Sequence, residues 1–535
     1  MFLLVMDEAS NIPALVFPYL RRLLRLFRHH PMWAFYLSTY NSIQRLQPEI
    51  KHDPSARIRE AVFQRHDPFL GLQLDIELNV RYANPIICRN ELQKPLVEFS
   101  SADNLTLYGR PLWRLYATSS LVALRSFVEL KLLGGTRSPF NPSNKDHVFA
   151  VLASRICLDP CLNNEESTRL IQTAVNSHLR IVVGMDQEDR IFRTITPSEP
   201  VVAHTAASLL MGSIGSTSGE PMMWKRCIEY LADTLLAGSL VEKGLKGEIY
   251  ARIIFILTRD YLLWDNGFRT QITGIFDANA FNWSKYFVAT DFLKGFLGPA
   301  DLKVVKPLGR LTRNANEASF TSIDELIGEA KMAFNHFTST DRVLNPRHIP
   351  QMLHDLLRQC AALQLAFSQP AWDLIVPMYY GAADDAFGEQ YVSAIFIQIK
   401  NTKQANRLIL GSQETCYFQH ITQPVIAILM DLGTQSSSPV WTYIPPAPGK
   451  HPACLSLHIK GNSSASYGVL RFAGLEEACA GLLHIITRVG DDLGTTICDL
   501  NSRFNYHSRS DRFPGCFDWE YKVEDEEGME LDEHQ

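Results

Sequence analysis

The segment VSAIFIQIKNT, residues 392–402, decides the fold of the C-terminal part of the chain. Its β-branched and aromatic residues predict a buried strand. Gln398 and Lys400 stand two positions apart in this strand, and alternate residues of a strand share one face. We therefore expect both polar side chains to point to the same side of a sheet. A lysine on so apolar a strand needs a partner of opposite charge or a hydrogen-bond acceptor.

The segment before this strand contains a candidate for the partner of Lys400. Residues 363–380, LQLAFSQPAWDLIVPMYY, contain two short apolar runs joined by a Ser-Gln-Pro turn, and Asp373 begins the second run. A neighbouring strand of this kind can place Asp373 beside the two polar side chains. Residues 348–363, HIPQMLHDLLRQCAAL, predict an amphipathic helix ahead of this pair. Residues 418–433, FQHITQPVIAILMDLG, predict the strand or helix that completes the core.

These three polar side chains suit metal-assisted phosphodiester hydrolysis. Asp373 would supply carboxylate oxygens to Mg²⁺, which prefers hard oxygen ligands. The metal activates water and offsets the charge that grows on the phosphate. Lys400 would position that water or stabilise the developing negative charge, whereas Gln398 adds only a neutral carbonyl ligand. A structural alternative carries equal weight: Lys400 ends a strand near solvent and pairs with Asp373 without a catalytic role.

The first residues of the chain form a second candidate site. Residues 2–6, FLLVM, are a continuous apolar run, which predicts a strand buried on both faces. The run ends at Asp7 and Glu8, as the Walker B strand of a P-loop ATPase does. In such a strand the first acid holds Mg²⁺ on the triphosphate and the second orients the attacking water. The ordinary alternative is a strand-to-loop junction.

Two further segments extend this candidate site. Residues 13–31 predict a helix and residues 32–42, MWAFYLSTYNS, a second strand, so the three elements make a parallel βαβ unit. Ser38, Thr39 or Asn41 at the end of this strand fits the role of a γ-phosphate sensor. A Gly-x-x-x-x-Gly-Lys-[Ser/Thr] loop, which would hold the phosphates, occurs nowhere in the sequence. We therefore expect a chain truncated before the Walker B strand, with no ATP turnover by this chain alone.

The sequence patterns in the middle of the chain predict helices. A Gly-Arg-Pro turn at residues 109–111 opens a helical apolar pattern that ends at Gly134–Gly135, and further helical patterns continue to about residue 298. This stretch predicts an α-rich lid or adaptor. Arg110 is either a lid arginine that reaches the nucleotide or a helix-start residue packed by Trp113.

Composition limits the remaining choices. A chain of 535 residues is too long for one hydrophobic core, so about two to four domains are expected. A net charge of -6 argues against a nucleic-acid coat but leaves room for a local basic groove. The ten cysteines include no CxxC pair, which favours reduced thiols. No window approaches the roughly 20 apolar residues of a membrane helix, and no signal peptide is visible. An intracellular protein, cytoplasmic or nuclear, is expected.

With these motifs in order, the chain resembles the Crinkler-type proteins of oomycetes and fungi. In that family a P-loop ATPase is joined to a restriction-endonuclease-like domain of the PD-(D/E)xK type. The segments that carry the resemblance are LLVMDEAS (3–10), FYLST (35–39), GRPLW (109–113), TPSEPV (196–201), EKGLKGEIYARIIFILTRD (242–260), MAFNHF (332–337), WDLIVP (372–377) and IFIQIKN (395–401). The resemblance implies a nucleotide-driven switch that controls a nuclease, linked to conflict between organisms or with mobile elements.

The resemblance assigns roles to individual residues. Asp373 matches the metal-binding aspartate, Gln398 the second acid position and Lys400 the lysine, while Asp7 and Glu8 match the Walker B acids. Glutamine at 398 removes one negative metal ligand.

The family pattern also expects a glutamate on the helix before the first strand of this pair. Here that helix offers Gln351, His354 and Asp355, of which only Asp355 is an acid. Both departures from the pattern weaken the expected affinity for Mg²⁺.

The expected organisation is a multidomain α/β protein. A partial P-loop ATPase core with a parallel sheet (1–103) precedes a helical lid or adaptor (104–300), a linker (301–320), an α/β restriction-endonuclease-like domain (321–510) and an acidic tail (511–535). The expected function is a Mg²⁺-dependent nuclease-like protein with a remnant ATPase module, with DNA or RNA as partner and no membrane. The alternatives are a catalytically decayed interaction scaffold or gene fragment, and a nucleotide-sensing module whose P-loop comes from a separate chain.

Overall fold

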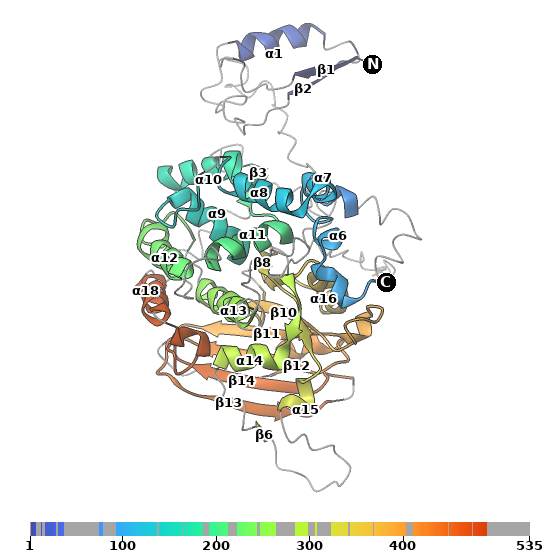
Figure 1. Ribbon diagram of the computed structural model, residues 1–535, viewed down its shortest axis with the longest axis vertical. Coiled ribbons are helices and arrows are strands. Elements are labelled where there is room, and N and C mark those ends of the chain that lie inside the picture. The colour runs from blue at the N-terminus through green and yellow to red at the C-terminus, as the bar shows by residue number, and fades with distance from the viewer. Residues whose placement is uncertain are drawn as a thin grey trace, which may run out of the picture.

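The computed structural model shows a mixed α/β protein (Figure 1). The residues that it describes are 2–6, 12, 16–27, 30, 32–36, 74–78, 93–135, 138–162, 164–185, 192–211, 222–242, 247–263, 284–297, 305–307, 323–340, 343–366, 369–402, 410–447, 449–472 and 474–488.

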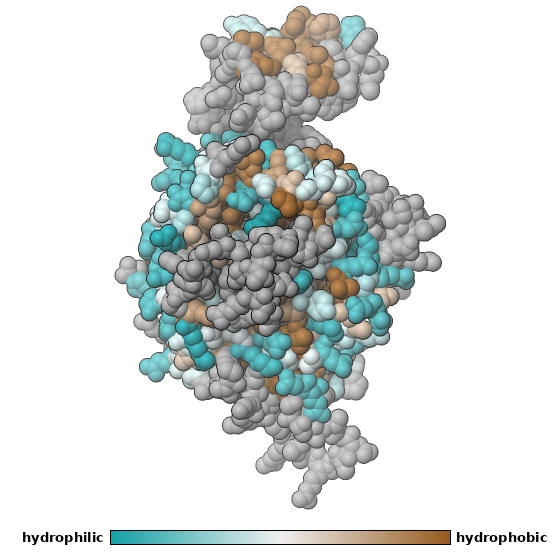
Figure 2. All heavy atoms as spheres, viewed as in Figure 1, coloured by the Kyte–Doolittle hydropathy of each residue, from teal (hydrophilic) through white to brown (hydrophobic). Residues whose placement is uncertain are grey.

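The N-terminal strand, helix and strand form as predicted. Strands β1 (Phe2–Met6) and β2 (Met32–Tyr36) pair in parallel, and α1 (Phe17–Leu26) connects them. The predicted burial of β1 on both faces is wrong, because Leu4 is 38% exposed and Val5 is 50% exposed. Among the described residues, β2 is the only strand that pairs with β1. Figure 2 shows hydrophobic residues at the surface of this unit.

The middle of the chain is mainly helical. Helix α8 (Leu121–Leu132) ends where the glycine pair predicts: Gly134 and Gly135 both have positive φ, and the Gly135 amide donates to the Leu130 carbonyl at 2.7 Å. One hairpin, which the helical patterns did not predict, interrupts the helices. The elements are η3 (Leu96–Ser100), α6 (Ala102–Leu105), α7 (Pro111–Ser119), α8 (Leu121–Leu132), α9 (Lys145–Ile156), α10 (Glu165–Ser177), β3 (Ile181–Met185), β4 (Phe192–Ile195), α11 (Pro200–Met211), α12 (Met222–Tyr230), the π-helix η4 (Leu231–Leu236) and α13 (Glu248–Leu263).

The C-terminal part is built on a ten-stranded mixed sheet. Its main path runs β5-β7-β10-β11-β12-β14-β13-β6, with β9 paired to β10 and β8 paired to β9. The strands are β5 (Phe287–Val288), β6 (Val305–Pro307), β7 (Lys331–Met332), β8 (His336–Ser339), β9 (Ala361–Gln364), β10 (Leu374–Tyr379), β11 (Val392–Lys400), β12 (Val425–Asp431), β13 (Ser437–Ile444) and β14 (Cys454–Lys460). The helices are α14 (Ala289–Leu297), α15 (Ile323–Ile327), η7 (Pro346–His348), α16 (Ile349–Arg358), η8 (Glu389–Tyr391), α17 (Ser412–Thr415), η9 (Cys416–Phe418), η10 (Gly468–Arg471) and α18 (Leu475–Arg488).

The centre of this sheet has the predicted order of elements. Helix α16 precedes β9, and β9, β10 and β11 pair antiparallel in turn. Strand β12, formed by the segment that predicted a strand or a helix, pairs with β11 in parallel. Strands β5 and β6 also belong to the sheet, although residues 104–300 were expected in the adaptor and residues 301–320 in a linker.

The helical middle and the sheet share one hydrophobic core. A single cluster of buried apolar side chains extends from Leu96 to Ile486. Figure 1 shows α13 and α14 in front of the central strands, and the Tyr250 hydroxyl of α13 donates to the Asn462 carbonyl just after β14 at 3.0 Å. No helix among the described residues has the length and apolarity that crossing a membrane requires. The cysteines of the described part are free thiols.

Candidate functional site

The strand register places Asp373 beside β11. Leu374 faces Ile397 in the antiparallel pair, so Asp373, one residue before β10, stands opposite Gln398. Carboxylate oxygen Oδ2 of Asp373 accepts a hydrogen bond from the Ile399 amide at 2.6 Å. The Asp373 amide donates to the Ile397 carbonyl at 2.8 Å. The carboxylate is therefore held against β11 between the two polar positions, as the sequence predicted.

The polar positions of β11 lie at its C-terminal end. Gln398 and Lys400 are partly exposed, whereas Ile397 and Ile399 on the opposite face are fully buried. The amide nitrogen of Gln398 donates to the Ala371 carbonyl at 2.9 Å, which leaves its carbonyl oxygen available as an acceptor or ligand. Towards the start of the strand the same face is apolar.

Aromatic packing closes that apolar part of the face. The ring of Phe396 lies 4.8 Å from the ring of Phe418 in η9 and 5.6 Å from that of Trp372. The face therefore changes from an aromatic core to a polar end within two residues.

Two neighbouring strands add charged side chains that sequence reasoning missed. Lys400 is paired in register with Asp431 of β12, and Asp431 is paired with Lys460 of β14. Partners in register share one face of a sheet, so the three side chains form a row across the strand ends. Two residues earlier on the same face, Gln398 is paired in register with Leu429, and Leu429 is paired with His458.

A weak signal for this row exists in the sequence. The residues LHIK at 457–460 repeat the pattern of IQIK at 397–400, with a polar residue and a lysine two positions apart at a strand end. Only the strand order shows that the two patterns lie on either side of β12.

Asp431 and His458 form a close pair within this row. Asp431 is fully buried, and its Oδ2 lies 3.6 Å from Nε2 of His458. Burial lowers the pKa of His458, and the Lys460 ammonium lowers it further, while Asp431 acts in the opposite direction. The imidazole is therefore neutral near pH 7.

Asp355 has contacts within its own helix. Its carboxylate lies 3.3 Å from Nδ1 of His354 and 3.4 Å from Nε2 of Gln351. The His354 ring packs against Phe387, with 4.7 Å between the ring centres. Among the described residues, no group of three or more His, Cys, Asp or Glu side chains is arranged to hold a metal ion.

The side chains at the strand ends can still contribute to a Mg²⁺ site. Asp373 offers a carboxylate and Gln398 a carbonyl oxygen, which makes two oxygen ligands from the protein. Mg²⁺ commonly binds through one or two carboxylates and takes its other ligands from water and substrate phosphates. Asp373 and Gln398 therefore supply the kind of oxygen ligands that Mg²⁺ accepts, in the low number that its protein sites often have.

Arg110 has the structural role of a helix-start residue. It is the N-cap of α7, and its guanidinium pairs with the carboxylate of Glu199, which is 2% exposed. Glu199 also accepts from the Arg110 amide at 2.9 Å and from the Trp113 indole at 2.7 Å. A second guanidinium nitrogen of Arg110 donates to the Leu179 carbonyl at 2.7 Å. These contacts fix the start of α7.

Five other residues were expected at a nucleotide site. Asp7, Glu8, Ser38, Thr39 and Asn41 lie outside the described residues.

Replacing Glu199 with Gln should lower the free energy of unfolding by about 2–3 kcal/mol, because it leaves a partly buried guanidinium without its counter-charge. Urea unfolding monitored by circular dichroism measures the change. An unchanged stability would contradict the structural role given to Arg110.

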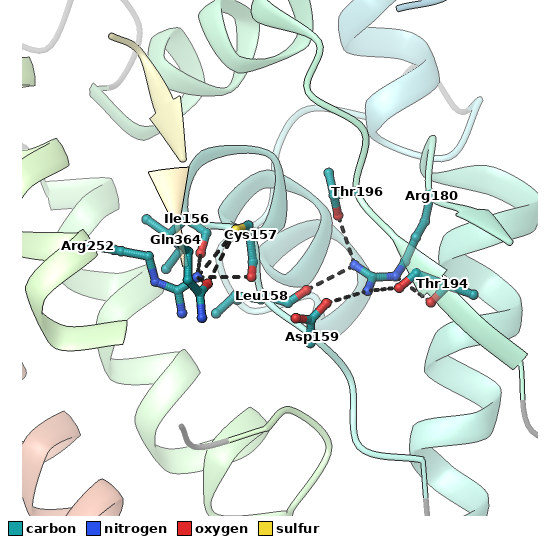
Figure 3. A network of polar contacts seen from close by, with 9 residues as sticks. All are labelled: Ile156, Cys157, Leu158, Asp159, Arg180, Thr194, Thr196, Arg252 and Gln364. Atoms are coloured by element: carbon teal, nitrogen blue, oxygen red, sulfur yellow. Dashed lines mark hydrogen bonds and ion pairs between the residues drawn. The ribbon is translucent and has the colours of Figure 1, made fainter. Parts of the chain in front are cut away.

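A second polar network ties the helical middle to the strand pair of the site (Figure 3). Arg252 of α13 donates to the carbonyls of Ile156 at 2.5 Å and Cys157 at 3.1 Å, where α9 ends, and to the side-chain oxygen of Gln364 in β9. Cations stabilise helix C-termini in this way. Gln364 pairs with Leu374, the residue after Asp373. The backbone carbonyl of Glu248, one turn earlier in α13, accepts from the Arg252 Nε at 3.3 Å.

Arg180 binds the residues that follow the end of α9. Its guanidinium donates to the Leu158 carbonyl at 3.0 Å, to Asp159 at 3.1 Å and to the Thr196 hydroxyl at 2.9 Å (Figure 3). Each of the two arginines therefore has a structural set of partners.

In comparisons with known proteins, no protein-family model, no curated protein and no solved structure matched the chain.

Proposed function

We propose that the chain is a metal-dependent nuclease-like protein whose phosphodiester site lies at the ends of β10, β11 and β12. The observation that supports this most directly is the position of Asp373 opposite Gln398, with its carboxylate bonded to the backbone of β11 beside Lys400. A carboxylate, a neutral oxygen ligand and a lysine at one partly exposed strand end are groups that metal-assisted phosphodiester hydrolysis can use.

Each side chain has a separate role in this proposal. Asp373 and the carbonyl oxygen of Gln398 would hold Mg²⁺. When bound, the metal would lower the pKa of a bound water and offset negative charge on the phosphate. Lys400 would bind a non-bridging phosphate oxygen and stabilise the charge that develops there. The hydrogen bond from Ile399 fixes the carboxylate orientation before substrate binds.

The N-terminal unit is proposed as a remnant ATPase module with a regulatory role. Its support is the parallel β1–α1–β2 arrangement and the acids that follow β1 in the sequence. Because the sequence contains no phosphate-binding loop motif, ATP turnover by this chain is not part of the proposal.

A catalytically decayed scaffold is the second candidate. The neutral Gln398 and the lack, among the described residues, of a group of three metal-binding side chains favour it. The two candidates differ in a single measurable property, which is metal-dependent cleavage.

The test is cleavage of plasmid DNA and of single-stranded RNA by the full chain, with Mg²⁺ or Mn²⁺ and with EDTA. The full chain is needed because the helical middle shares its core with the sheet. Asp373→Asn keeps the acceptor for Ile399 but removes the charge, and Lys400→Ala removes the ammonium. We expect each variant to cut at least about 100-fold more slowly than the wild type.

Lys294→Ala is the matched control, because Lys294 is an exposed lysine of α14 paired with Asp291 at 3.2 Å. Cleavage that persists in EDTA, or that survives both site variants, would contradict the proposed site. A folded wild-type chain that cuts neither substrate would support the scaffold.

A further inference from the structure

We propose that the buried guanidinium groups of Arg155 and Arg259 form an internal binding site for a small monovalent anion, for which chloride is the probe. Arg155 belongs to α9 and Arg259 to α13, two helices that pack together with α11 in the helical middle of the chain (Figure 1). The inference does not depend on the nuclease proposal, because none of these residues belongs to the strand ends.

The first argument is the charge of this pair of arginines. Both side chains are fully buried, and both guanidinium groups bond to the carboxylate of Asp260, which is fully buried as well. The two contacts reach the same oxygen, Oδ1, at 2.7 Å from Arg155 and 2.6 Å from Arg259. Two positive charges therefore share one negative charge, and one positive charge is left over.

The second argument is that the neighbouring groups do not remove this surplus. Among the described residues, Asp260 is the carboxylate whose charge acts on Arg259, and the thiol of Cys360, which also faces Arg259, has its pKa raised to about 12 by burial. The charges that act on the buried rings of His204 and His336 are those of arginines. Burial and these arginines lower the pKa of both rings, so the histidines are neutral at pH 7 and leave the surplus unchanged.

The third argument is the set of unused hydrogen-bond donors. Within the described part of the chain, Nε of Arg155 and both Nε and Nη2 of Arg259 are buried without a hydrogen-bond partner. A further nitrogen of Arg155, Nη1, donates to the Ala203 carbonyl at 3.2 Å, and a carbonyl offers only a partial charge. Buried N–H groups in native proteins nearly always have a partner from protein, water or a bound ion. Water would satisfy the donors but would leave the charge, whereas an anion satisfies both.

The surroundings limit the size and the charge of this anion. The cluster lies among fully buried side chains such as Trp224, whose indole donates to Oδ2 of Asp260 at 3.3 Å. A single surplus charge matches a monovalent anion, because a doubly charged sulfate or phosphate would leave a buried negative charge. Chloride is small, carries one charge and accepts hydrogen bonds from N–H groups, so it fits each of these conditions.

The test is urea unfolding of the full chain, followed by circular dichroism, in mixtures of sodium chloride and sodium gluconate at constant ionic strength. Gluconate is too large for an enclosed site. For the wild type we expect the unfolding equilibrium constant to fall about tenfold for each tenfold rise in chloride above its dissociation constant, as for one bound anion. Arg259→Gln leaves one guanidinium for one carboxylate and should remove this dependence.

Arg169→Gln is the matched control, because it also removes one arginine charge, but from a side chain that is 70% exposed. This variant should keep the wild-type dependence on chloride. An equal dependence in Arg259→Gln and the wild type would overturn the site, and so would a wild-type stability that does not change with the proportion of chloride.

A second measurement decides the question if Arg259→Gln does not fold. Wild-type crystals grown in sodium bromide should show an anomalous peak within hydrogen-bond reach of the Arg155 and Arg259 guanidinium groups. Ordered water at this position without anomalous signal would overturn the anion site.

Discussion

Replacing Asp260 with Asn is expected to lower the free energy of unfolding by about 3–5 kcal/mol, one of the two largest effects expected in this chain. Oδ1 of Asp260 accepts from the guanidinium of Arg155 at 2.7 Å and from that of Arg259 at 2.6 Å. All three side chains have 0% exposure. The substitution keeps the shape of the side chain but leaves two buried positive charges without a counter-charge.

The surroundings of the pair explain why little can compensate. The Trp224 indole donates to Oδ2 of Asp260 at 3.3 Å, so three helices, α9, α12 and α13, meet at this carboxylate. Burial lowers the pKa of Arg259 to about 10, although Asp260 acts against that shift. Among the described residues, Nε of Arg155 and both Nε and Nη2 of Arg259 have no hydrogen-bond partner. The carboxylate is therefore the main compensation for both guanidinium groups.

Urea unfolding followed by circular dichroism measures the loss. Glu165→Gln is the matched control, because it also removes one charge from an arginine pair. Glu165 lies 2.5 Å from Arg169 on α10, but both side chains are more than two-thirds exposed. Its cost should be roughly a few tenths of a kcal/mol. If both substitutions cost equally little, the buried arginines must be neutralised by another route and the argument fails.

The strand pair of the candidate site could be predicted because its signals are local. An apolar run with β-branched residues identifies β11, and alternation places Gln398 and Lys400 on one face. The apolar run that follows Asp373 identifies the neighbouring strand, whereas the register across the connection of residues 380–391 is known only from the structure. The predicted steps need only residues that are close in the sequence.

The other half of the site depends on strand order, which is a tertiary property. Asp431 ends an apolar run in the sequence and reads as an ordinary strand end. Only the path β11-β12-β14 places it between two lysines. Strands β5 and β6 were missed for another reason: segments of two or three residues carry no periodicity.

Burial of charged helix residues was also beyond local patterns. Arg155, Arg259 and Asp260 occur in helical segments where charged residues usually face solvent. Helices from several parts of the sequence pack around these residues, so the pattern of any single segment does not indicate their burial.

The second large effect concerns His336, which should make the chain sensitive to acid. Its ring is 1% exposed, with Nε2 2.8 Å from the Ser198 hydroxyl and Nδ1 2.6 Å from the Asn335 side-chain oxygen. The pKa of His336 is lowered from 6.5 to about 3. Burial is the largest cause, and the positive charges of Arg155 and Arg259 contribute to the same shift. The native state therefore holds this ring neutral.

The sign of the effect follows from proton uptake. Between the ordinary pKa of 6.5 and the native value of about 3, the unfolded chain binds a proton that the native chain does not. The stability that the neutral ring contributes is therefore fully present above the ordinary pKa, and it is lost as the pH falls through that window. From about pH 6.5 to about pH 4.5 the loss is on the order of 2–3 kcal/mol for one histidine. His204 acts in the same direction, since burial and nearby arginines lower its pKa.

Urea unfolding at a series of pH values measures this dependence. In His336→Gln, the slope of the free energy of unfolding against pH should fall by about one bound proton between the two pKa values. The lost hydrogen bonds should also lower the stability of this variant at neutral pH. The slope is therefore the readout, and the stability at any one pH is not. His420→Gln is the control, because His420 is exposed and its replacement should leave the slope unchanged. A wild-type slope in His336→Gln would show that this ring takes up its proton without unfolding, and the arginines beside it could not then be what holds it neutral.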